Sequence, residues 1–159
     1  MGSYRLLLRS RYAHTRRAMM VEYRTSGRQR VIVIGGTRLA SLRDWLAAID
    51  VSALRARQPG ATALLLDFRA EGFTPGAREA NALIGTLLAL CADHVPPVAI
   101  LTNPGSQYGG ARMLCTLGEL RACRAAAFRD EGEAWRWLET LAPGRPGPTP
   151  ARVPVALEA

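Results

Sequence analysis

Residues 98–138 read VAILTNPGSQYGGARMLCTLGELRACRAAAFRDEGEAWRWL, and they alternate strand patterns with helix patterns. It opens on the apolar run 98–102, which is typical of a short buried strand, and an Asn-Pro-Gly turn follows. Apolar residues then recur at helical spacing over 108–121. A second apolar run at 125–128 predicts another strand, and Asp130 is placed to cap a further helix. Strands that alternate with helices predict an α/β protein.

The preceding segment repeats the same order of a strand followed by a helix. Residues 63–68 form a nearly continuous apolar run, as expected for a strand that is covered on both faces. Thr74 and Pro75 predict the start of a helix, with Thr74 as the N-cap and Pro75 at the first helical position. Apolar residues at helical spacing continue this helix to Cys91.

The N-terminal third predicts an antiparallel hairpin ahead of these units. The strand patterns at 20–24 and 28–34 are separated only by a short turn, so the two strands must be antiparallel neighbours. A helix that Ser41 caps follows the hairpin. The complete order predicts a mixed, mostly parallel sheet of about five strands, covered by four helices and built from right-handed crossovers.

Length and composition predict one domain between two tails. The chain has 159 residues, of which 48% are hydrophobic, and this is enough for one domain with its own core. We assign residues 20–142 to the domain and 143–159, which is rich in proline, to a disordered tail. Residues 1–19 form a basic tail that contains five arginines and no acid.

The charge of the chain lies largely in this basic tail. The net charge is +8, and removing residues 1–18 leaves 16 basic and 13 acidic residues, a net charge of +3. A basic tail can bind nucleic acid or anionic lipid. The alternative is that the true start is Met19 or Met20, and we favour it because the strand pattern begins at Met20.

The cysteines and the apolar stretches of the sequence indicate the cellular compartment in which we expect the protein. The three cysteines include no Cys-x-x-Cys pair, so the sequence predicts neither a disulfide framework nor a zinc site. The longest mostly apolar stretch, 80–92, is well short of the ~20 residues that a membrane span needs. We therefore expect a cytoplasmic protein with no metal or cofactor.

Two motifs in the C-terminal half resemble a known family. They are NPGSQYGGARM at 103–113 and FRDEGEAWRWL at 128–138. This combination resembles the SpoIIAA-like, or STAS-like, family of small bacterial proteins, and the same element order extends over residues 20–141. The family shares its fold plan with anti-sigma-factor antagonists and with the CRAL-TRIO lipid carriers. The resemblance implies a compact domain that binds rather than catalyses.

The resemblance also points to one candidate phosphoacceptor. Anti-sigma-factor antagonists are phosphorylated on a Ser or Thr that follows the central strand, next to an Asp, at the start of a helix. The matching stretch here is 67–75, in which Thr74 is the one hydroxyl residue and no Asp directly precedes it. From the residues themselves, Thr74 is instead an ordinary N-cap.

A candidate ligand site lies where two parallel strands end. Ligands of such sheets bind beyond the carboxyl ends of the strands, and helix N-termini with glycines favour anions. The site that we predict consists of Asp67, Asn103, Tyr108, Gly109, Gly110 and Arg112. The alternative is structural: the glycines relieve packing, Tyr108 covers the core and Arg112 pairs with an acid such as Asp67 or Asp130. The spacing matches no phosphate-loop or dinucleotide motif.

These observations predict a non-catalytic, STAS-like regulatory or binding domain that engages a protein partner as a monomer or weak dimer. The sequence offers no nucleophile–base pair, so we do not expect an enzyme. The alternative is a protein that binds a small anionic ligand or a lipid through the strand-end loops. Nucleic-acid binding depends on the arginine-rich tail alone. Trp135 lies off the apolar face of the last predicted helix and is a candidate anchor for a partner.

Overall fold

The computed structural model describes the backbone of residues 4–8 and residues 19–35, 62–70, 74, 76–90 and 96–141. The strands are β1 (Tyr4–Leu8), β2 (Met19–Ser26), β3 (Gln29–Gly35), β4 (Ala63–Asp67), β5 (Val98–Leu101) and β6 (Ala125–Phe128). The helices are α3 (Ala77–Leu90), α4 (Ser106–Glu119) and α5 (Glu131–Thr140). The helix predicted after Ser41 and the tail predicted at 143–159 lie outside the described residues.

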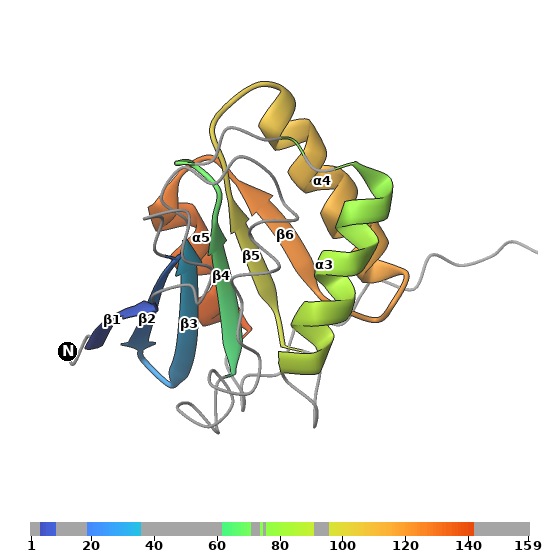
Figure 1. Cartoon of the computed structure of the whole chain (residues 1–159). Helices are drawn as coiled ribbons and strands as arrows, with labels where there is room; N and C mark the ends of the chain where they lie inside the picture. The colour runs from blue at the N-terminus through green and yellow to red at the C-terminus, as the bar shows by residue number, and fades with distance from the viewer. Residues whose placement is uncertain are drawn as a thin grey trace, which may run out of the picture.

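The strands form one mixed sheet in the order β1-β2-β3-β4-β5-β6 (Figure 1). β1, β2 and β3 are antiparallel neighbours, whereas β3 to β6 are all parallel. The predicted α/β class, the five predicted strands and the antiparallel hairpin are therefore confirmed. β1 was not predicted from the sequence; it lies in the segment 1–19 and pairs Leu6 with Val21 in its register.

The sequential strand order places α3 and α4 on the same face of the sheet. Each parallel crossover moves in the same direction, and right-handed crossovers of this kind put their helices on one side. Figure 1 shows α3 and α4 together on one side of the strands. The core on this side joins alternate strand residues to both helices; it includes Ile32, Ile34, Leu64, Leu66, Val98, Ile100, Leu83, Ile84, Leu87, Ala111 and Leu114.

α5 covers the opposite face. Its buried residues Ala134 and Leu138 pack against the other alternate set of strand residues, which consists of Val31, Val33, Ala63, Leu65, Ala99 and Leu101. Asp130 is the N-cap of α5 as predicted, because its side chain accepts a hydrogen bond of 2.9 Å from the backbone N–H of Glu133. At the other end, the buried Gln29 donates from Nε2 to the carbonyl oxygen of Leu138 at 2.9 Å.

The prediction that Thr74 caps the second helix is wrong. α3 begins at Ala77, and Gly76 occupies the N-cap position, where its carbonyl oxygen accepts from the N–H of Ala80 at 2.8 Å. The N–H of Gly76 donates to Oε2 of Glu79 at 3.1 Å, which is the carboxylate half of a capping box. This contact fixes the start of the helix beyond Thr74, which is exposed.

Two leucine truncations separate core packing from surface exposure. Leu138→Ala removes a fully buried side chain of α5 and should lower the free energy of unfolding by about 2–5 kcal/mol. Leu120→Ala is the matched control, since Leu120 is 79% exposed and its truncation should change stability by less than about 0.5 kcal/mol. Urea denaturation measures both, and equal losses would contradict the packing of α5 on the sheet.

Candidate functional site

The loops that follow β4 and β5 are tied together by two side-chain amides. Gln107, in the first turn of α4, is 9% exposed. Its Nε2 donates to the carbonyl oxygen of Phe68 at 2.8 Å, and its Oε1 accepts from the N–H of Asn103 at 2.8 Å. Asn103 donates from Nδ2 to the carbonyl oxygen of Arg69 at 2.6 Å. These bonds fix the strand-end loops relative to each other. Gln107 was not among the site residues predicted from the sequence.

The carboxylate of Asp67 is held by Arg69. Oδ1 accepts from Nε of Arg69 at 3.0 Å and Oδ2 accepts from Nη2 at 2.7 Å, which is a bidentate pair. The hydrogen bond with Asp67 holds the pKa of the Arg69 guanidinium above its ordinary value. Asp67 follows the buried Leu66 in β4 and belongs to the sheet face that α5 covers. The predicted anion site is therefore divided, because Asp67 does not share a face with α4.

Glu131, at the start of α5, joins two arginines that are far apart in the sequence. Its Oε2 accepts from Nη2 of Arg69 at 3.0 Å, and its Oε1 accepts from Nη1 of Arg24 at 3.3 Å. Arg24 also pairs with the buried Glu22, whose Oε2 lies 2.6 Å from Nη2. The five side chains Glu22, Arg24, Asp67, Arg69 and Glu131 form one network, which we call the Glu131 network.

Trp135 is part of the same region rather than a free anchor. The guanidinium carbon of Arg24 lies 5.8 Å from the centroid of the Trp135 ring, a cation–π contact. Nε1 of Trp135 donates to Oε1 of Glu131 at 3.4 Å. The ring is half-buried and packs against the core beneath α5. These contacts explain the position of Trp135 without a partner.

The other predicted site residues gather at the first two turns of α4. Tyr108 is half-buried, Gly110 is buried, and Gly109 and Arg112 are exposed. Tyr108 and Arg112 are four residues apart, so they lie on one face of the helix. Arg129 was not among the predicted site residues, and its guanidinium carbon lies 5.0 Å from the centroid of the Tyr108 ring.

Neither acid that was considered as a partner of Arg112 pairs with it. Asp67 pairs with Arg69, and Asp130 caps α5. Within the part of the chain that the structure describes, no carboxylate lies within ion-pair distance of Arg112. Thr74 is exposed ahead of α3, and its phosphorylation stays a prediction.

α4 begins without a side-chain cap. The helix starts at Ser106, two residues before the predicted start at Tyr108. Its N-cap is Gly105, with φ 95° and ψ −144°, and no side chain accepts from the first turn. This backbone conformation is essentially restricted to glycine. The N–H groups of Tyr108 and Gly109 donate to the carbonyl oxygen of Gly105 at 3.1 and 3.3 Å, so the conformation of Gly105 sets where the helix begins.

Two glycine substitutions test this start of the helix. Gly105→Ala forces a side chain onto a backbone with positive φ and should destabilise the protein by about 1–3 kcal/mol. Gly109→Ala is the matched control, because a Cβ there meets nothing within 4 Å and alanine favours a helix by about 0.5–1 kcal/mol. We expect urea denaturation to show a lower free energy of unfolding for Gly105→Ala and a higher one for Gly109→Ala. An unchanged free energy of unfolding for Gly105→Ala would contradict the backbone geometry.

The two described cysteines are buried thiols. Cys115 lies in α4 and Cys123 follows it, and neither forms a disulfide. Burial raises the pKa of the Cys115 thiol from 9.0 to about 12, so the group stays protonated near neutral pH. A protonated, buried thiol is a poor nucleophile.

The raised pKa of Cys115 makes stability depend on pH in the alkaline range. The unfolded chain loses this proton from about pH 9, whereas the folded chain keeps it up to about pH 12, so the free energy of unfolding falls as pH rises across this window. Cys115→Ala should remove up to about 1.4 kcal/mol per pH unit of this slope. Urea denaturation at several alkaline pH values measures it, and identical slopes for the two proteins would contradict the burial of the thiol.

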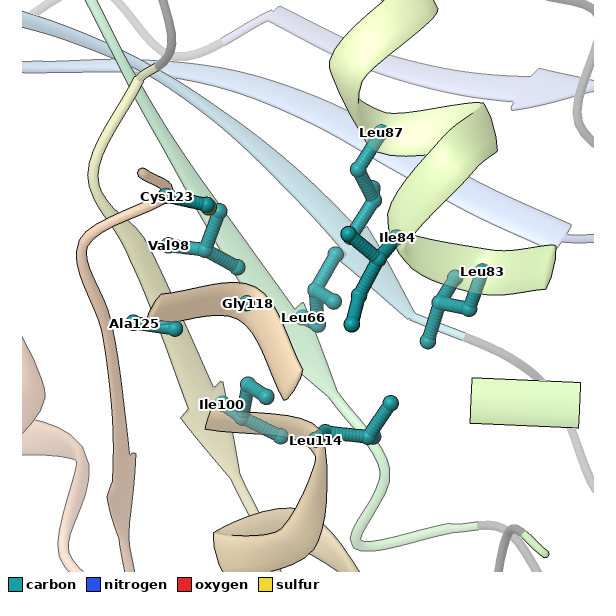
Figure 2. A pocket seen from close by; sticks show the side chains of 10 residues that line it. All are labelled: Leu66, Leu83, Ile84, Leu87, Val98, Ile100, Leu114, Gly118, Cys123 and Ala125. Carbon is teal, nitrogen blue, oxygen red and sulfur yellow. The ribbon is translucent and has the colours of Figure 1, made fainter. Parts of the chain in front are cut away.

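A small apolar cavity lies between α3, α4 and the sheet (Figure 2). Its lining residues are Leu66, Leu83, Ile84, Leu87, Val98, Ile100, Leu114, Gly118, Cys123 and Ala125. The space open to the centre of a water-sized sphere is about 10 Å³. That is about enough for one water molecule, which needs polar partners to stay, and it is far too small for an acyl chain.

The described residues contain neither a metal cluster nor a membrane-spanning helix. No three or more of their His, Cys, Asp or Glu side chains are grouped so that they could hold a metal ion. No helix in the described ranges is both long and apolar enough to cross a membrane. The chain matches no protein-family model, no curated protein and no solved structure. The fold is that of an α/β protein with a mixed sheet.

Proposed function

We propose that this chain is a non-catalytic, STAS-like regulatory or binding domain that docks a protein partner. The docking face is the carboxyl-end surface, which we define as Asn103, Tyr108, Arg112 and Arg129. The observation that carries the proposal is the stack of Arg129 on Tyr108 at 5.0 Å, beside the exposed Arg112. Tyrosine and arginine are the residues that most often dominate the binding energy of protein interfaces.

The rigidity of this surface supports docking. Gln107 and Asn103 hold the two strand-end loops through hydrogen bonds of 2.6 to 2.8 Å. A surface that is already ordered loses less conformational entropy when a partner binds. The side chains of Tyr108 and Arg112 also project from a helix, which positions them more firmly than a loop would.

The ion pairs formed by the two carboxylates near the strand ends support binding over catalysis. Asp67, at the end of β4, and Glu131, at the start of α5, are both engaged by Arg69. A general base has to accept a proton from a substrate, and a bidentate ion pair opposes this. The carboxyl-end surface therefore offers hydrogen-bond donors and an aromatic ring, which suit recognition.

A small anion is the alternative ligand for the same surface. The uncapped start of α4 favours it, because the first N–H groups of a helix attract negative charge. Thermal unfolding in inorganic phosphate, against chloride at matched ionic strength, distinguishes the two. A rise in Tm that Arg112→Glu abolishes would favour the anion, and an unchanged Tm would favour the protein partner.

Charge reversal tests the proposed docking surface. The variant Arg112→Glu/Arg129→Glu should lose a partner that the wild-type chain captures from lysate of its own source, by at least about tenfold, because both cations become repulsive. Quantitative mass spectrometry of the captured proteins measures this. The matched control is Arg28→Glu/Arg124→Glu, which reverses two exposed arginines at the opposite end of the strands. Equal capture by both variants would contradict the assignment.

A further inference from the structure

We infer that Arg129, stacked on Tyr108, binds a carboxylate in an acidic segment of the partner protein. This inference rests on the proposed function and adds the chemistry that the partner must present. Two arginines of this chain, Arg24 and Arg129, lie over aromatic rings, and they differ in whether carboxylates of the chain bind them.

Arg24 shows how the chain uses a stacked guanidinium. Its guanidinium lies over the ring of Trp135 at 5.8 Å, and its N–H groups bind two carboxylates. Nε donates to Glu22 at 2.8 Å, and Nη1 donates to Glu131 at 3.3 Å. The ring of Trp135 therefore lies against the guanidinium of Arg24 while the N–H groups of Arg24 bind carboxylates.

Arg129 has the same arrangement without the carboxylates. Its guanidinium lies over Tyr108 at 5.0 Å, and none of the acids in the described ranges forms an ion pair with it. The nearest acids in the sequence are committed, since Asp130 caps α5 and Glu131 binds Arg24 and Arg69. Arg129 is exposed, and a guanidinium carries five N–H donors and no acceptor.

The surrounding charge favours a single carboxylate over a polyanion. Arg112 is the second exposed cation of the carboxyl-end surface. Glu133, in the first turn of α5, adds an acid to this region, whereas Glu131 is already paired with Arg24 and Arg69. Nucleic acid and anionic membranes need a larger excess of positive charge than two cations supply, whereas a carboxylate of an acidic protein segment needs only one guanidinium.

The test is an NMR titration of the full chain with a short peptide of alternating Glu and Ala. We expect shifts at the Nε–H signal of Arg129 and at the amides around Tyr108, and none with the matching Gln and Ala peptide. Arg129→Lys keeps the charge but loses the planar fork, and it should weaken binding by about tenfold. Arg124→Lys is the matched control, since Arg124 is exposed before β6, and it should bind as the wild type does.

The ring of Tyr108 provides a second pair of variants. Tyr108→Phe keeps the stack and should keep binding, whereas Tyr108→Leu should weaken it. Equal binding by Arg129→Lys and wild type, or no shift at Arg129, would overturn the inference. Stronger binding of inorganic phosphate through Arg129 would also overturn the choice of a carboxylate.

The outcomes separate this inference from the proposed function on which it rests. If the peptide fails to bind while partner capture still depends on Arg112 and Arg129, the proposed docking surface is retained. The inference that Arg129 binds a carboxylate is then rejected. Capture that survives the charge reversal would instead remove the proposed function.

Discussion

The direction of the crossovers between the parallel strands controls which face of the sheet each described helix covers. Because β3 to β6 are parallel and follow one another across the sheet, α3 and α4 must pack on one face. Among the described helices, this leaves α5 to cover the other face, and Ala134 and Leu138 bury the strand residues there. A helix in this position starts at the carboxyl end of β6, beside the loops where ligands of parallel sheets bind.

The position of α5 then decides which charges are available. Its first residue, Glu131, forms ion pairs with Arg24 of β2 and with Arg69 of the loop after β4. Arg69 also pairs with Asp67. These groups pair with one another on the side of the sheet that α5 covers. On the α4 side, Arg129 lies over Tyr108 and Arg112 is exposed, and neither arginine forms an ion pair with an acid of the described residues. The division of the strand ends into an internally paired half and an open half follows from the topology.

Local pattern was sufficient for most of the fold. The run at 28–34 and the helical spacing of Ala80, Leu83 and Leu87 predict β3 and α3, and Asp130 predicts the start of α5. The start of α3 was predicted wrongly because Thr74 and Gly76 are both acceptable N-caps. The hydrogen bond from the N–H of Gly76 to Glu79 decides between them. The pairing of β1 with β2 could not be predicted from the sequence. Nor could the hydrogen bond between Arg69 and Glu131, which are 62 residues apart. Arg129 was missed because its stack on Tyr108 joins two elements that only the folded sheet brings together.

The most direct test of this account is the rate at which each arginine exchanges its Nε–H proton with water, measured by NMR and assigned with single Arg→Lys variants. We expect slow exchange for Arg24 and Arg69, whose Nε groups donate to carboxylates within the chain, and fast exchange for Arg112 and Arg129. Protection of Arg129 equal to that of Arg69 would contradict it, because its donors would then be occupied inside the protein.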